Sequence, residues 1–195
     1  KPIAAIASKI MAGAPLASSD GVEIKDPEAS RPAIVAFSPE GKVLGTIKLG
    51  GGSAAAKAAG VAATLPNALG FDRAGNLYLA ETGSGGGQFD PPIATKGGGI
   101  TMFPVASLGA LAAGREAAIG YLAVPDGGPD GIQVAPDGSI HFNTVGAGAG
   151  LKDPAEGGMY RITREAFTSG KLPAPFAHGL GALDGLDLAG GKRLD

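Results

Sequence analysis

The chain has 195 residues, 44% of them hydrophobic, with 16 Lys and Arg against 18 Asp and Glu and a formal net charge of −2. This length is enough to bury a core, and the near-neutral charge, without a basic stripe, argues against nucleic-acid binding. No apolar run reaches the about 18 residues of a membrane span, and the absence of cysteine excludes disulfides and thiolate chemistry. We therefore expect neither nucleic acid nor a membrane as a partner. Residues 1–6 faintly resemble the end of a signal peptide, which slightly favours a periplasmic or secreted protein.

The first predicted elements are two strands within residues 34–48, joined by a tight turn at 38–41. The alanine-rich residues 53–59 follow and are predicted to form one or two helical turns in a connection. Elsewhere we expect no helix that is long and periodic enough to belong to a core.

The next predicted element is a hairpin that occurs twice, at residues 66–79 and 129–142. Each copy is an alternating apolar run, a turn with glycine and a second alternating run, and the copies begin 63 residues apart, at positions 66 and 129. Similar spacing recurs for the Asp-Pro pairs that begin at 26, 90 and 153, and for strand-like runs at 34–37, 100–103 and 159–162. The hairpin pattern restarts at 183–188.

Four strands per repeat predict an all-β fold, a β-propeller of four-stranded antiparallel blades. We expect one incomplete propeller domain over 1–195, with approximate blades at 1–50, 66–124 and 129–178 and the start of a further blade at 183–195. About three blades cannot close a ring, so the remaining blades are expected from the missing part of the chain or from another chain. A β-solenoid is the main alternative, although its repeat is usually shorter.

The order of the strands predicts which loops share a face. The turns after first and third strands are expected to be tight, and the connections after second and fourth strands to be long: 82–99, 145–158, 49–65 and 171–182. Binding residues concentrate in long loops on a rigid scaffold, so the site is predicted on the long-loop face.

Three oxygen-bearing side chains occupy one repeat position at the start of the innermost strands: Asn67, Asp130 and Asp184. Equivalent positions in consecutive blades converge near the propeller axis, and hard oxygen ligands suit calcium or another divalent ion such as magnesium. The alternative is that they are ordinary turn residues, whose side chains bond their own backbone.

Five other residues or segments bear on the predicted site. Glu81 and Thr144 end the second strands on the long-loop face and are predicted to line a substrate pocket. His178, in the connection 171–182, is a candidate general acid or base. His141, in the middle of a strand, is predicted to be packed and hydrogen-bonded. The glycine-rich run 146–150 lacks the last glycine and the helix of a dinucleotide site.

At these residues the chain resembles the regucalcin and gluconolactonase family of six-bladed calcium propellers. The resemblance rests on Pro66-Asn67-Ala68-Leu69 with Gly75-Asn76-Leu77-Tyr78, and on Pro129-Asp130-Gly131-Ile132. It implies six blades in the complete protein, a divalent ion at the channel mouth and the opening of lactones. Asn67 would be an Asn ligand, and Asp130 or Asp184 the Asp ligand that doubles as the base. The chain departs from the family at Ala68, where a glycine is usual, and shows no early Glu ligand.

The function that we expect is a calcium-dependent hydrolase of lactones or related esters, so the expected partner is a small-molecule substrate. Its site is expected at the channel mouth, with Asp130, Asp184 and His178 as catalytic candidates. The alternative is a non-catalytic β-propeller module that binds a ligand or a protein through the same face.

Overall fold

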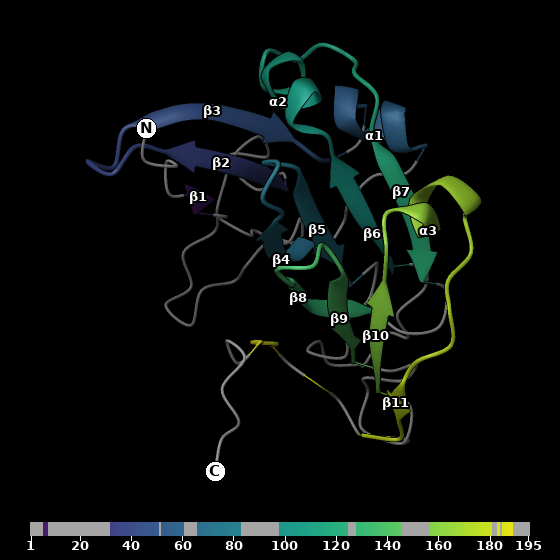
Figure 1. The fold of residues 1–195 in the computed structure, drawn as a ribbon. Helices are drawn as coiled ribbons and strands as arrows, with labels where there is room; N and C mark the ends of the chain where they lie inside the picture. Colours follow the sequence, from purple (N-terminus) through teal and green to yellow (C-terminus); the bar gives the residue numbers. More distant parts are fainter. Residues whose placement is uncertain are drawn as a thin grey trace, which may run out of the picture.

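A computed structural model describes residues 6–7, 32–50, 52–60, 66–82, 98–124, 128–145, 157–180, 183 and 185–188. Their regular structure is mostly β, in three antiparallel sheets, with three short helices (Figure 1). The expectation of a β-rich antiparallel fold is therefore confirmed.

The first sheet has three strands, in the order β1 (Ile6–Ala7), β2 (Ala33–Phe37) and β3 (Val43–Lys48). Its hairpin turns where predicted, and Gly41 takes a φ of 82°, a left-handed conformation that glycine adopts without strain. Helix α1 (Ala54–Ala59) follows, as predicted. It begins at Ser53, whose hydroxyl accepts from the Ala56 N–H, and ends at Gly60 in the left-handed conformation.

The second and third sheets have four strands each, paired in chain order. The second contains β4 (Pro66–Phe71), β5 (Leu77–Glu81), β6 (Gly98–Phe103) and β7 (Gly120–Val124). The third contains β8 (Pro129–Val134), β9 (Ile140–Thr144), β10 (Gly158–Ile162) and β11 (Ala177–His178). The two predicted hairpins are β4–β5 and β8–β9 and are confirmed by their antiparallel pairing.

In the second and third sheets the connection after the third strand is not a tight turn, whereas the first sheet has the predicted tight turn at 38–41 between β2 and β3. Helix α2 (Val105–Ala112) lies between β6 and β7, and α3 (Glu165–Ser169) lies between β10 and β11. The expectation of short turns at these places was wrong because each helix is only one or two turns long, too short to give a periodic apolar pattern. Both helices contact the second sheet or its turns. At the start of α2 the Val105 N–H donates to Asn76 Oδ1 at 3.0 Å, and the ring of Phe167 in α3 lies 5.9 Å from that of Tyr78.

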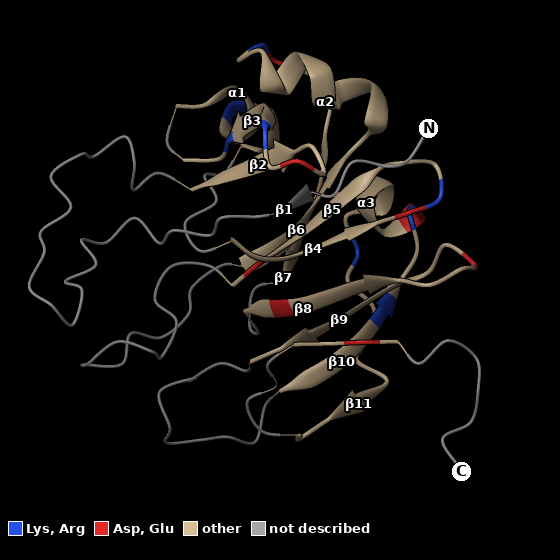
Figure 2. Ribbon diagram, turned by 90° about the vertical axis from the view of Figure 1, so that its left-hand side faces the viewer, with Lys and Arg blue, Asp and Glu red and all other residues tan. Residues whose placement is uncertain are grey.

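The second sheet packs on both of its faces, and Figure 2 shows the three sheets stacked one above another. Alternation along β5 sends Leu77 and Leu79 toward the first sheet, where they meet residues such as Ile34 and Ile47. Tyr78 and Ala80 point the other way, into a second core with residues such as Phe142 of the third sheet. The fold is thus a stack of sheets with one core at each junction.

The first strands of the second and third sheets, β4 and β8, lie side by side. A Cβ on Gly70, near the end of β4, would be 3.4 Å from Val134 Cγ2 at the end of β8. At the start of β8, Thr82, just after the end of β5, binds the Pro129 carbonyl. The two strands therefore start at the same end of the stack and run in the same direction.

The segment 183–188 continues this series next to β8. Gln133 Nε2 donates to the Leu186 carbonyl at 3.2 Å, and Asn143 Nδ2 donates to the Leu183 carbonyl at 2.8 Å. The described part of this segment thus lies beside β8 much as β8 lies beside β4.

Candidate functional site

Buried polar side chains gather at the end of the stack where β4 and β8 begin and β5 and β9 end. The members of this cluster are Glu81, Thr82, Asp130, Asn143 and Thr144, each at most 6% exposed. Burying polar groups costs free energy unless they find hydrogen-bond partners or a ligand. We therefore treat this end of the stack as the candidate site.

A β-bulge occurs at the same repeat position in both inner strands. The register of β4 against β5 shifts between Pro66 and Ala68, and that of β8 against β9 shifts between Pro129 and Ile132. Asn67 and Asp130 lie within these irregularities. The repeated bulge gives Asn67 and Asp130 equivalent places on neighbouring strands. Bulges re-aim side chains and are common beside active sites.

Asn67 and the backbone before Asp130 are joined through one hydroxyl. Asn67 Nδ2 donates to Thr82 Oγ1 at 3.3 Å, and Thr82 Oγ1 donates to the Pro129 carbonyl at 2.8 Å. The amide nitrogen of Asn67 is used in this way, so Oδ1 is the atom of that side chain with the chemistry to bind a cation.

The chemical type of these side-chain oxygens suits a hard divalent cation. The Asn67 amide oxygen and the Asp130 carboxylate are the oxygen ligands that calcium prefers, although calcium takes about six to eight of them. Among the residues that the structure describes, no group of three or more His, Asp and Glu side chains could hold a metal ion. Asp184, the third predicted ligand, lies outside the described residues.

His178 lies apart from Asn67 and Asp130. It is exposed on β11, where it pairs with Gly158, and not in a single connection over 171–182 as predicted. In the third sheet β11 and β8 form opposite edges. At about 4.8 Å per strand, this order separates the backbones of the two strands by about 14 Å.

The Thr144 hydroxyl is hydrogen-bonded to a neighbouring strand of its own sheet. Its Oγ1 accepts from the Gly158 N–H at 3.0 Å, and its side chain is buried. His141 is packed and hydrogen-bonded, as predicted. Its Nε2 lies 3.0 Å from Ser139 Oγ, and its ring contacts that of Phe176 edge-on.

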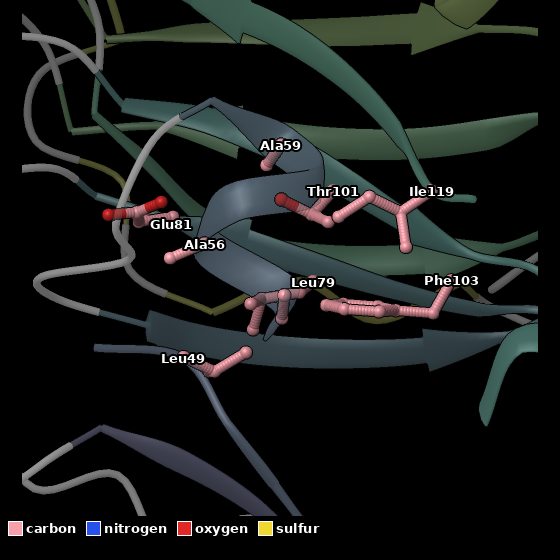
Figure 3. A pocket seen from close by; sticks show the side chains of 9 residues that line it. Leu49, Ala56, Ala59, Leu79, Glu81, Thr101, Phe103 and Ile119 are labelled. Carbon is pink, nitrogen blue, oxygen red and sulfur yellow. The ribbon is translucent and has the colours of Figure 1, made fainter. Parts of the chain in front are cut away.

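Glu81 lines a small pocket between the second sheet and the segment that contains α1 (Figure 3). Apart from Glu81 and Thr101, the residues that line this pocket are apolar. The full lining is Leu49, Ala55, Ala56, Ala59, Leu79, Glu81, Thr101, Phe103 and Ile119. Burial, together with the nearby Glu81 carboxylate, raises the pKa of the Tyr121 phenol. Neither Asn67 nor Asp130 lines this pocket, so Glu81 and the two predicted ligands do not share it.

The acidic residues at the opposite end of the stack anchor turns. Asp72 Oδ1 accepts from the Ala74 and Asn76 N–H groups, and Oδ2 accepts from Asn76 Nδ2 and the Tyr78 hydroxyl. Burial works against ionisation of Asp72, but these hydrogen bonds outweigh it and lower its pKa. Burial, with the Asp72 charge beside the hydroxyl, raises the pKa of Tyr78 to about 12.

Two buried residues of the candidate site, Thr82 and Asn143, were missed from the sequence. Thr82 stands one place beyond the end of the predicted strand, and nothing in the sequence places it against Pro129. Asn143 carried a usable signal, because the equivalent residue of the preceding repeat is the buried Ala80. An amide in place of a methyl group on a buried strand needs a polar partner.

The chain matches no protein-family model and no curated protein. No helix among the described residues is long and apolar enough to cross a membrane.

Proposed function

We propose that this chain is part of a β-propeller that hydrolyses lactones or related esters with calcium, or another divalent ion, at the end where β4 and β8 begin. The propeller is supported by the stacking of antiparallel sheets whose first strands lie side by side, and by the segment 183–188 that continues the series. The site is supported by one observation above all: the repeated bulge that carries Asn67 and Asp130.

In this proposal different side chains bind the cation and transfer the proton, with Asp130 a candidate for both roles. Asn67 Oδ1 and the Asp130 carboxylate would hold the cation, which when bound supplies a Lewis acid for the substrate carbonyl. Asp130 or Asp184 would accept a proton from water as the water oxygen bonds to the carbonyl carbon. The ring C–O bond then breaks, and the proton passes to the departing alkoxide, so that the product is a hydroxy acid. We leave His178 out of this machinery because it lies on the opposite edge of the sheet from β8.

The test is hydrolysis of a series of five- and six-membered lactones and aryl esters, followed by acid release in calcium, in magnesium and in a chelator. Asp130→Asn keeps the shape of the side chain and should lower kcat by about 10²-fold or more. Asp137→Asn is the matched control, because Asp137 lies in the turn at the other end of the same hairpin. A wild-type protein that hydrolyses none of these substrates in the presence of either ion would refute the hydrolase.

The second candidate is a non-catalytic propeller module that binds a ligand or a protein. The hydrogen bonds that occupy Asn67, Thr82 and Thr144 favour it, because residues that only hold the fold together make such contacts. A protein that calcium stabilises but that opens no lactone and cleaves no ester would support this candidate.

A further inference from the structure

Thr82 occupies a tight junction between the second and third sheets. Its side chain is buried, and two glycines allow the backbones to approach it. A Cβ on Gly98 would be 2.7 Å from Pro129 Cδ and 3.0 Å from the Thr82 carbonyl, and one on Gly128 would be 3.0 Å from Thr82 Cγ2. Larger residues at either glycine would separate Thr82 from Pro129.

The Thr82 hydroxyl fixes two partners together. It has one proton, which it donates to the Pro129 carbonyl, so its lone pairs are left to accept from Asn67 Nδ2. A donor that is itself an acceptor polarises both bonds in the same sense. One hydroxyl thus binds both the backbone carbonyl immediately before Asp130 and the side-chain amide of Asn67.

The same backbone position is held again in the next repeat by a different side chain. Asn143 Nδ2 donates to the Leu183 carbonyl, and Leu183 occupies the place in its repeat that Pro129 occupies in the preceding one. Gly131 lets the two segments approach, since a Cβ there would be 2.5 Å from the Leu186 nitrogen. A threonine and an asparagine, from different positions of their repeats, thus bind carbonyls at one repeat position.

We infer that Thr82 is a positioning residue, which sets the geometry of the Asn67 and Asp130 oxygens through the two hydrogen bonds of its hydroxyl. This inference rests on the proposed function, in which those two side chains hold a cation. Groups that orient metal ligands usually change metal affinity by about 10- to 100-fold when they are removed.

The experiment compares Thr82→Val, which keeps the shape and loses the hydroxyl, with Thr82→Ser, which keeps the hydroxyl. Calcium affinity, measured by isothermal titration calorimetry, should fall by about 10- to 100-fold in T82V and stay close to wild type in T82S. The control is Thr101→Val, which removes the hydroxyl of another buried threonine, on β6, and it should leave the calcium affinity unchanged. Equal affinities in T82V and wild type would overturn the inference.

A second readout separates this inference from the proposed function. If the wild-type protein binds no calcium, the proposed function fails, and Thr82 is then judged by NMR in the absence of the ion. The Asn67 side-chain amide and the Asp130 backbone amide should shift in T82V and not in T82S or T101V. Should T82V fail to fold, the wild type alone decides: a missing nuclear Overhauser effect between Thr82 and the Asn67 side-chain amide would overturn the inference.

Discussion

Tyr121 on β7 lies across Gly99 on β6, in the space that a side chain at Gly99 would need. A Cβ added to Gly99 would be 2.5 Å from Tyr121 Oη and 2.6 Å from the ring. Gly99 also pairs with Glu81, whose carboxylate charge acts on the Tyr121 phenol. The absence of a side chain at Gly99 therefore lets Tyr121 lie close to Glu81.

Gly99→Ala is expected to destabilise the fold by about 1–3 kcal/mol, because the Tyr121 ring must leave its position to relieve the contact. Urea denaturation followed by circular dichroism measures the free energy of unfolding. Gly109→Ala is the matched control: Gly109 lies inside α2 with nothing within 4 Å of its added Cβ. Alanine there should stabilise the helix by up to about 1 kcal/mol. Two substitutions with equal effects would contradict the steric explanation.

Phe142→Ala is expected to cost about 3–5 kcal/mol, since the ring is fully buried between the second and third sheets and stacks on Tyr160 at 4.8 Å. Phe176→Ala removes the same side chain from a position that is 62% exposed and should cost far less. Thermal unfolding of both variants by calorimetry tests the difference. A small loss for Phe142→Ala would mean that the core between these sheets is not as described.

The Asp137 carboxyl should make the stability of the fold depend on acid pH. Its pKa is lowered from 3.8 to about 2 because the Ser139 hydroxyl and N–H donate to Oδ1 and the Arg161 guanidinium binds Oδ2. Since the folded pKa lies below the unfolded one, the stabilisation is complete above about pH 4 and is lost as the pH falls toward 2.

Urea-denaturation midpoints across this acid range should therefore fall more steeply in the wild type than in Asp137→Asn. Arg161→Gln, which removes only the guanidinium, should give an intermediate slope, because the hydrogen bonds from Ser139 remain. Identical slopes in all three proteins would show that Asp137 does not titrate below its ordinary range.

Calcium is expected to raise the melting temperature, and Asp130→Ala to abolish most of the rise. A ligand bound only by the folded state adds about 2.7 kcal/mol at a hundredfold excess over Kd, and each kcal/mol is worth about 2–4 °C in a chain of this size. Melting curves in chelator, calcium and magnesium test this, with Asp137→Ala as the control at neutral pH. Equal melting temperatures in every condition would leave Asn67 and Asp130 as turn and bulge residues.

The hairpins and α1 could be predicted from the sequence because each depends on local chemistry. Alternation and a glycine turn determine β4–β5 and β8–β9, and Ser53 with a run of alanines determines α1. The eight residues of α2 follow Pro104 and show no periodic pattern; they owe their place to contacts such as Leu111 with the core next to the first sheet. Sequence alone could not reveal that contact.

The equivalence of Asn67 and Asp130 was predictable because it follows from the repeat. The bond of Thr82 to Pro129 was not, because it joins residues that only the stacking of sheets brings together. His178 was assigned to a connection because a strand of two residues, β11, is too short to leave an alternating pattern.

Because the second sheet has a core on each face, we expect its inner strand β5 to be among the last parts of the described fold to open. All five residues of β5 are buried, and separation of the first sheet alone would leave the β5 side facing Phe142 still covered. The β5 amide hydrogens are also bonded within the sheet, to β4 and β6, so we expect them to exchange with solvent deuterium only in openings close to global unfolding. The first and third sheets can open locally and independently of each other, whereas exchange at β5 measures the stability of the whole cooperative unit.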